Sequence, residues 1–189
     1  MADLAAARLN MVESQVRPSD VTDIRIHDAM RRIAREDFVP EGKAYLAYAD
    51  SAVEYSAGRY LLRPRDVAKL LQFVKPLEGE RALAIAAPYA AAVLEDCGVA
   101  VTRHDGPDLT ALPGGGYDLI VVEGAVGAVP PAWLAALAPS GRLGVVERTG
   151  PGGQACLYVK NADGIGRRSL FDATPPILAG FEVQPGFAF

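Results

Sequence analysis

Residues 81–94 have the sequence Arg81-Ala-Leu-Ala-Ile-Ala-Ala-Pro-Tyr-Ala-Ala-Ala-Val-Leu94, an apolar strand followed by a helix with no glycine between them. In doubly wound α/β proteins the first turn from strand to helix carries glycines, because the chain must turn tightly and let a cofactor approach its backbone. Alanines and Pro88 fill that turn here, and the proline also removes one backbone donor. The segment therefore marks the place of a cofactor loop and argues against a cofactor in it.

Short apolar runs alternate with helical segments after this turn. We expect strands at residues 82–86, 99–103, 118–122 and 142–147 and helices at residues 89–97 and 130–137. Such alternation predicts a mostly parallel sheet with helices on its faces. Residues 155–160 and 167–171 flank Asn161-Ala-Asp-Gly164, which predicts an antiparallel hairpin. The tail, which includes Pro185 and Gly186, is expected to be extended coil.

Helices are also expected before the sheet, at residues 3–15 and 23–35. Asp23 can cap the second of these, and Arg31, Arg32 and Arg35 are expected to face water. After an irregular stretch, Pro64 opens another helix. We therefore predict a single domain of 189 residues, with an N-terminal helical cap and loop region over residues 1–75 and an α/β core with its tail over residues 76–189.

Composition excludes several classes of function. Hydrophobic residues make up 50% of the chain, charged residues 22%, and the net charge is -4, which argues against disorder and against nucleic-acid binding. The apolar runs are broken well before the roughly 18 residues that span a bilayer, and the N-terminus lacks a signal-peptide pattern. We expect a cytoplasmic protein that binds neither nucleic acid nor membrane. His27 and His104 lie far apart without a cysteine or acidic motif, so no metal site is expected.

Several motifs resemble, in order and spacing, those of the protein-L-isoaspartate O-methyltransferase family. They are Met11-Val-Glu-Ser-Gln-Val16, Phe38-Val39-Pro40, Gly58-Arg59-Tyr60-Leu61-Leu62-Arg63-Pro64, Tyr89-Ala-Ala-Ala-Val93-Leu94 and Tyr117-Asp118-Leu-Ile-Val-Val-Glu123-Gly-Ala. The resemblance covers nearly the whole chain. It implies a Rossmann-like S-adenosylmethionine methyltransferase fold, a substrate loop within residues 1–75, and methyl esterification of isoaspartyl carboxyl groups in damaged proteins.

The chain departs from the family pattern where the cofactor should bind. That pattern has an acid followed by Gly-x-Gly-x-Gly, and all of these residues are absent here. The chain also lacks about two dozen residues before Tyr117, roughly one strand and one helix, which would include the acid that grips the cofactor ribose. By the resemblance, the vestigial cofactor positions are Ala84, Ala86, Ala87, Tyr89, Asp105 and Glu123. We therefore expect no cofactor, or S-adenosylmethionine if the family activity survives.

Three groups of residues could still support chemistry, although none is assigned as catalytic. Glu123 lies at the end of a predicted central strand, where ligands of open α/β sheets bind, or is simply a strand-end carboxylate that is hydrated or caps a neighbouring loop. His104 is expected to be a surface histidine, and Asp105 resembles the adenine-side acid of the family if its strand is the third family strand, a register that stays open. The substrate or anion loop comprises Arg59, Tyr60, Leu62 and Arg63 together with the neighbouring Arg65.

This loop has two interpretations. Its arginines could receive a carboxylate or phosphate by bidentate hydrogen bonds, or they could be solvated and paired with Asp50 and Asp66. Leu62 stands where the family has a hydroxyl residue, so its side chain cannot donate a hydrogen bond to a substrate carboxylate. The sequence leaves both interpretations open.

Three hypotheses about function follow. The first is a pseudoenzyme that has lost S-adenosylmethionine binding and acts by binding an unknown protein partner. The second is an active isoaspartyl methyltransferase, and the third is a binder of a small anionic ligand. Because the missing strand leaves residues 99–103 near a sheet edge, we also expect a homodimer that forms through this edge.

Overall fold

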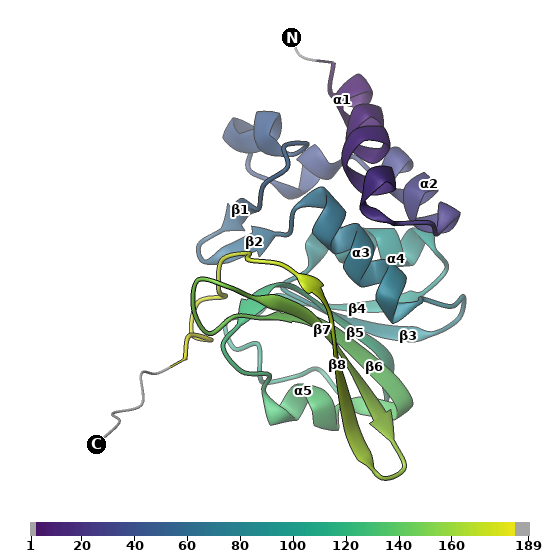
Figure 1. Cartoon of the computed structure of the whole chain (residues 1–189), viewed down its shortest axis with the longest axis vertical. Coiled ribbons are helices and arrows are strands. Elements are labelled where there is room, and N and C mark those ends of the chain that lie inside the picture. The colour runs from purple at the N-terminus through teal and green to yellow at the C-terminus, as the bar shows by residue number, and fades with distance from the viewer. Residues whose placement is uncertain (1–2, 184–189) are drawn as a thin grey trace.

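A six-stranded sheet forms the centre of the structure, a computed structural model that describes residues 3–183 (Figure 1). The strand order is β4-β3-β5-β6-β7-β8; the first four strands are parallel, and β7 and β8 run antiparallel to their neighbours. This confirms the expected mostly parallel sheet with a C-terminal hairpin. The strands are β3 (Arg81–Ile85), β4 (Ala100–His104), β5 (Tyr117–Val126), β6 (Leu137–Glu147), β7 (Gln154–Asn161) and β8 (Gly164–Asp172).

The two faces of the sheet have separate apolar cores because successive side chains of a strand point to opposite sides. On β3, Ala82 and Ala84 join the core under the N-terminal helices, whereas Leu83 and Ile85 join a second core that contains Trp133. In Figure 1, α3 and α4 lie on the first face and α5 on the other. The helices are α1 (Leu4–Met11), α2 (Ile24–Arg32), α3 (Pro64–Val74), α4 (Pro88–Asp96) and α5 (Pro131–Ala135).

The first half of the helical cap contains the two predicted helices. Asp3 caps α1 and Asp23 caps α2, each through a side-chain oxygen that accepts a backbone N–H of the first turn. A π-helical turn (Val12–Val16) continues α1, and short 3₁₀ turns fill much of the segment before β1. However, α2 ends at Arg32 instead of residue 35, and Arg35 begins a 3₁₀ turn.

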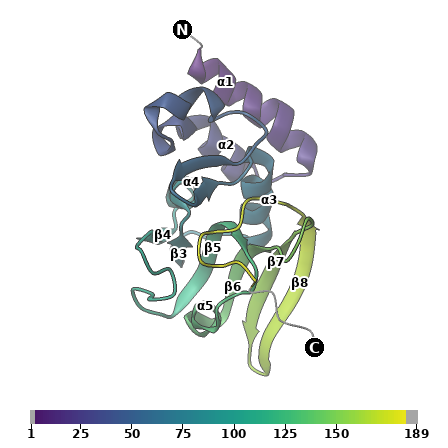
Figure 2. The same ribbon diagram turned by 90° about the vertical axis from the view of Figure 1, so that its left-hand side faces the viewer.

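A small hairpin lies between the cap and the sheet. It consists of β1 (Val53–Ser56) and β2 (Arg59–Leu61), and β2 packs against β5. Figure 2 shows the hairpin beside the C-terminal segment, which pairs with β5 through Ala125. The predictions for Pro185 and Gly186 lie outside the described residues.

Strand β4 is an outer strand of the sheet, as the short sequence before Tyr117 predicts. It pairs in parallel with β3 along its whole length, from Arg81 opposite Ala100 to Ile85 opposite His104. Asp105 therefore follows the second strand of the β3-α4-β4 unit, directly beside the strand that carries the glycine-free turn.

Candidate functional site

The carboxyl ends of β3, β4 and β5 bring together the residues predicted at the cofactor position. The connection between β3 and α4 is only Ala86 and Ala87, both buried. Ala86 has φ +46°, a left-handed conformation that costs a residue with a Cβ about 1–2 kcal/mol. Its N–H donates to the carbonyl of His104 at 2.9 Å, which ties the turn to β4. Ala86 thus holds a conformation that ordinarily favours glycine.

Glu123 is the central polar residue of this edge. Its carboxylate is 0% exposed and accepts two backbone hydrogen bonds: from Ala90, in the first turn of α4, at 3.1 Å, and from Leu62 at 3.2 Å. A carboxylate is favourable at a helix N-terminus because the unpaired N–H groups there carry partial positive charge. Burial nevertheless raises the pKa of Glu123 to about 7, since desolvation outweighs these hydrogen bonds and the nearby charge of Arg35. Glu123 is therefore not a hydrated carboxylate; of the interpretations the sequence offers, the geometry fits a carboxylate that caps neighbouring backbone N–H groups.

Arg35 is fully buried, so the expectation that it faces water from a helix is wrong. Its Nε donates to the carbonyl of Ala47 at 2.8 Å and its Nη2 donates to the carbonyl of Leu62. The guanidinium carbon lies 4.6 Å from the centre of the Tyr89 ring. The physical reason is the early end of α2, which turns this side chain toward carbonyls of the loop region. Among the described residues, Arg35 Nη1 and the Tyr89 hydroxyl have no hydrogen-bond partner.

Asp105 lies at the end of β4 and is held by the β1–β2 hairpin. The Tyr55 hydroxyl donates to Oδ2 of Asp105 at 2.9 Å, and Arg59 Nε lies 3.5 Å from Oδ1. Arg59 Nη2 also donates to the carbonyl of Gly106 at 2.8 Å. Burial and the charge of Asp105 raise the pKa of Tyr55 well above its usual value, so the hydroxyl stays a donor. Sequence reasoning missed Tyr55, because its partner lies 50 residues away.

The arginines of the predicted anion loop do not converge on one point. Arg59 faces Asp105, Arg63 donates to Asp66 at 2.8 Å, and Arg65 lies 3.6 Å from Asp50. Tyr60 is paired with Glu54 across the hairpin. The side chain of Leu62 is buried, and its backbone joins Glu123 to Arg35. The paired arrangement with Asp50 and Asp66 thus describes Arg63 and Arg65, and Arg59 alone lies at the carboxyl edge of the sheet.

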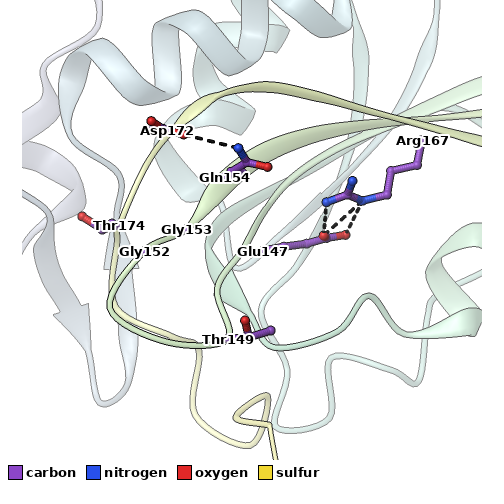
Figure 3. Close-up of a pocket in the computed structure, with 8 residues that line it drawn as sticks. All are labelled: Glu147, Thr149, Gly152, Gly153, Gln154, Arg167, Asp172 and Thr174. Carbon is purple, nitrogen blue, oxygen red and sulfur yellow. Dashed lines mark hydrogen bonds and ion pairs between the residues drawn. The ribbon is translucent and has the colours of Figure 1, made fainter.

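A surface groove of about 590 Å³ lies away from this edge and is formed by the β6–β7 loop and β8. Figure 3 shows Glu147 paired there with Arg167, at 2.5 Å, and Gln154 directed toward Asp172. None of Ala86, Asp105 or Glu123 lines it. Within residues 3–183, no group of three or more His, Cys, Asp or Glu side chains is placed to hold a metal ion.

Membrane crossing by a helix finds no support in the described part of the chain. No helix between residues 3 and 183 has both the length and the apolar character that a bilayer requires.

Comparisons with known proteins agree on one family. The family model described as "Protein-L-isoaspartate(D-aspartate) O-methyltransferase (PCMT)" matches residues 7–104. A protein-L-isoaspartate O-methyltransferase of Methylorubrum extorquens is 34% identical and covers 82% of this chain and 79% of its own length. One of Methylorubrum populi is 37% identical and covers 80% and 84%.

Solved structures share the fold. The crystal structure of a beta-aspartate methyltransferase (PCMT) from Plasmodium falciparum in complex with S-adenosyl-L-homocysteine superposes with a TM-score of 0.71 at 17% identity, covering 94% of this chain and 99% of that one. A second, a protein-L-isoaspartate O-methyltransferase, has a TM-score of 0.67 at 20% identity, covering 88% and 64%. The expected Rossmann-like methyltransferase fold is confirmed. The expectation that no cofactor binds is contradicted, because a chain of this fold holds S-adenosyl-L-homocysteine and the matched family consists of methyltransferases.

Proposed function

The chain belongs to the protein-L-isoaspartate O-methyltransferase family, and from that premise we propose that it is an S-adenosylmethionine-dependent enzyme that methyl-esterifies isoaspartyl carboxyl groups in damaged proteins. The observation that carries the proposal is the position of Asp105. In dinucleotide-binding α/β folds an acid about 20 residues after the first turn accepts hydrogen bonds from ribose hydroxyls. Asp105 follows the turn at Ala86 by that distance and ends the strand beside it.

Two features of the described structure fit a nucleoside-bearing cofactor at this edge. Asp105 offers a carboxylate at the end of β4, and Ala86 keeps the left-handed backbone that a tight turn at this point requires. When bound, S-adenosylmethionine supplies a sulfonium methyl group for transfer to a nucleophile. Asp105 would hold its ribose, and the turn at Ala86–Ala87 would lie against its amino-acid part.

The acceptor chemistry suits the residues of this edge. A carboxyl group has an ordinary pKa of about 4, so the substrate carboxylate is already ionised at neutral pH and needs no general base. The protein then has to position the carboxylate and exclude water. Arg59 is the cation at the same edge, and we assign it the substrate carboxylate because guanidinium groups bind carboxylates in a bidentate way.

Titration and turnover test the proposal together. The purified protein should bind S-adenosylhomocysteine in isothermal titration and should methylate an isoaspartyl peptide but not the normal aspartyl peptide of the same sequence. Asp105→Asn should weaken binding at least 10-fold, because a hydrogen bond to a charged group contributes about 1.5–3 kcal/mol. Asp163→Asn, in the exposed β7–β8 turn, is the matched control and should leave binding unchanged. Absence of both binding and methylation would reject the proposal.

A second candidate is a binding protein that keeps the methyltransferase fold but transfers no methyl group. The observation in its favour is the buried, glycine-free connection at Ala86 and Ala87. Its partner would be a protein, and the outer strand β4 is where we propose that two copies pair. Light scattering at tens of micromolar would detect that dimer. The third hypothesis, an anion binder built on Arg59 and Arg63, has less support because these side chains pair with different acids.

A further inference from the structure

One segment of the chain bonds to both acids at the carboxyl edge of the sheet. Residues 55–62 comprise most of the β1–β2 hairpin and the residue that follows it. At one end, Tyr55 and Arg59 contact Asp105; at the other, the backbone N–H of Leu62 donates to Glu123. The segment thus runs from the end of β4 to Glu123 within β5, across the position of the turn after β3.

The contacts at Asp105 occupy both of its carboxylate oxygens. Oδ2 accepts from the Tyr55 hydroxyl at 2.9 Å, and Oδ1 faces Arg59 Nε at 3.5 Å. A ribose diol would need those same oxygens. Arg59 strengthens the closure through its 2.8 Å hydrogen bond to the carbonyl of Gly106, which lies next to Asp105 in the chain. A ligand that bridges both oxygens with its diol would therefore compete with the hairpin for this carboxylate.

The hairpin has little stability of its own. Its strands have only four and three residues, and isolated two-stranded hairpins are marginal in water. At the turn, Gly58 accepts a hydrogen bond from the N–H of Ala179 at 3.4 Å, a long and weak contact. Val53 and Leu61 anchor the ends of the hairpin in the core, whereas its outer part, residues 55–59, is held by a few tertiary hydrogen bonds and can open locally without unfolding the sheet.

We infer that the β1–β2 hairpin is a lid over the proposed cofactor site, latched by Tyr55 and Arg59 on Asp105, and that an adenosyl ligand binds only to the state in which this latch is open. The inference rests on the proposed function. Opening also frees Arg59, the group assigned above to the substrate carboxylate.

Tyr55→Phe tests the latch because it removes one hydroxyl and little else. Apparent affinity equals the intrinsic affinity multiplied by the fraction of open molecules. A hydrogen bond to a carboxylate contributes roughly 1.5 kcal/mol or more, so its loss should raise the open fraction, and the affinity for S-adenosylhomocysteine, about 10-fold. Tyr45→Phe is the matched control, since Tyr45 is 73% exposed, and its affinity should equal that of the unaltered chain.

Hydrogen exchange supplies a readout that needs no ligand. The backbone amides of residues 55–59 should exchange faster in Tyr55→Phe than in Tyr45→Phe, while those of β3 and β5 should be unchanged. Thermal unfolding of each variant confirms that the sheet is intact.

The outcomes separate the lid from the proposed function. If the unaltered chain binds S-adenosylhomocysteine and Tyr55→Phe binds it equally or more weakly, the lid is wrong and the proposed function stands. If only Tyr55→Phe binds measurably, the lid is supported, and the proposed function fails unless the unaltered chain methylates the isoaspartyl peptide. If neither chain binds at millimolar ligand, the proposed cofactor site is wrong and the lid falls with it.

Discussion

Replacing Glu123 by glutamine should make the free energy of unfolding depend much less on pH. Burial raises the pKa of this carboxyl from 4.5 to about 7, so the folded state holds a proton that the unfolded state has released. The stability linked to this group is therefore fully present below pH 4.5 and is lost as the pH rises through about 7. A shift of this size corresponds to about 3 kcal/mol, at roughly 1.4 kcal/mol for each pH unit.

Glutamine isolates this effect because it resembles the protonated acid. Both side chains are uncharged, and each has one terminal oxygen that only accepts and one terminal group that carries a hydrogen. In both, that second group lies beside the backbone N–H of either Ala90 or Leu62. The two proteins should therefore have similar stability near pH 5. By pH 8 the unaltered protein carries a buried charge, with Arg35 and Tyr89 as its charged and titratable neighbours, and Glu123→Gln should be more stable by up to about 3 kcal/mol.

Urea unfolding followed by circular dichroism at half-unit steps from pH 5 to pH 8 measures the difference. All other titratable groups are the same in both proteins, so their contributions cancel in the subtraction. Glu41→Gln, at an exposed position, is the matched control and should run parallel to the unaltered protein. Parallel curves for Glu123→Gln as well would refute the reasoning, and so would a difference that grows toward acid pH.

Two further substitutions test the packing around the site. Gly124→Ala should destabilise the protein by more than about 2 kcal/mol in urea unfolding, because φ is +131° and a Cβ would lie 2.7 Å from the side chain of Leu178. As a control, Gly42→Ala places a Cβ where nothing lies within 4 Å, and its stability should stay within about 1 kcal/mol of that of the unaltered chain. Arg35→Ala should lower the free energy of unfolding by at least about 3 kcal/mol, since it leaves two buried carbonyls without a hydrogen-bond donor. The control Arg17→Ala, at an exposed position, should lower it by no more than about 1 kcal/mol, and equal losses would contradict the burial of Arg35.

The fold could be predicted because its signals are local. Alternating strands and helices from Ala82 onward predict the parallel strands, and Asn161 to Gly164 predict the hairpin between β7 and β8. Even the outer position of β4 follows from a count of residues before Tyr117. Each of these inferences uses a short window of sequence and a rule of geometry.

The sequence predicts several positions of the site but not the contacts between them, because these contacts join residues far apart in the chain. Arg35 looks like Arg31 and Arg32 in sequence, and its burial depends on carbonyls 12 and 27 residues away. Glu123 did carry a usable signal. It is an acid inside a run that is otherwise apolar or glycine from Leu119 to Val126, and a charge in such a run has to find buried donors. Nothing in the sequence names Ala90 and Leu62 as those donors.

The glycine-free turn and the family membership are compatible once the roles of the two acids are separated. Glycines are needed where a ligand must approach the backbone closely, and the first turn of α4 already receives an anion from within the protein, the carboxylate of Glu123. The helix terminus is thus satisfied without a ligand, and the connection can consist of buried alanines. Recognition of an adenosyl ligand then depends on the β4 side, where Asp105 offers two oxygens that the hairpin now holds. It follows that restoring glycine at Ala86 should change affinity for S-adenosylhomocysteine less than releasing Tyr55 from Asp105, because the first change makes room where no contact is required and the second frees the acceptor itself.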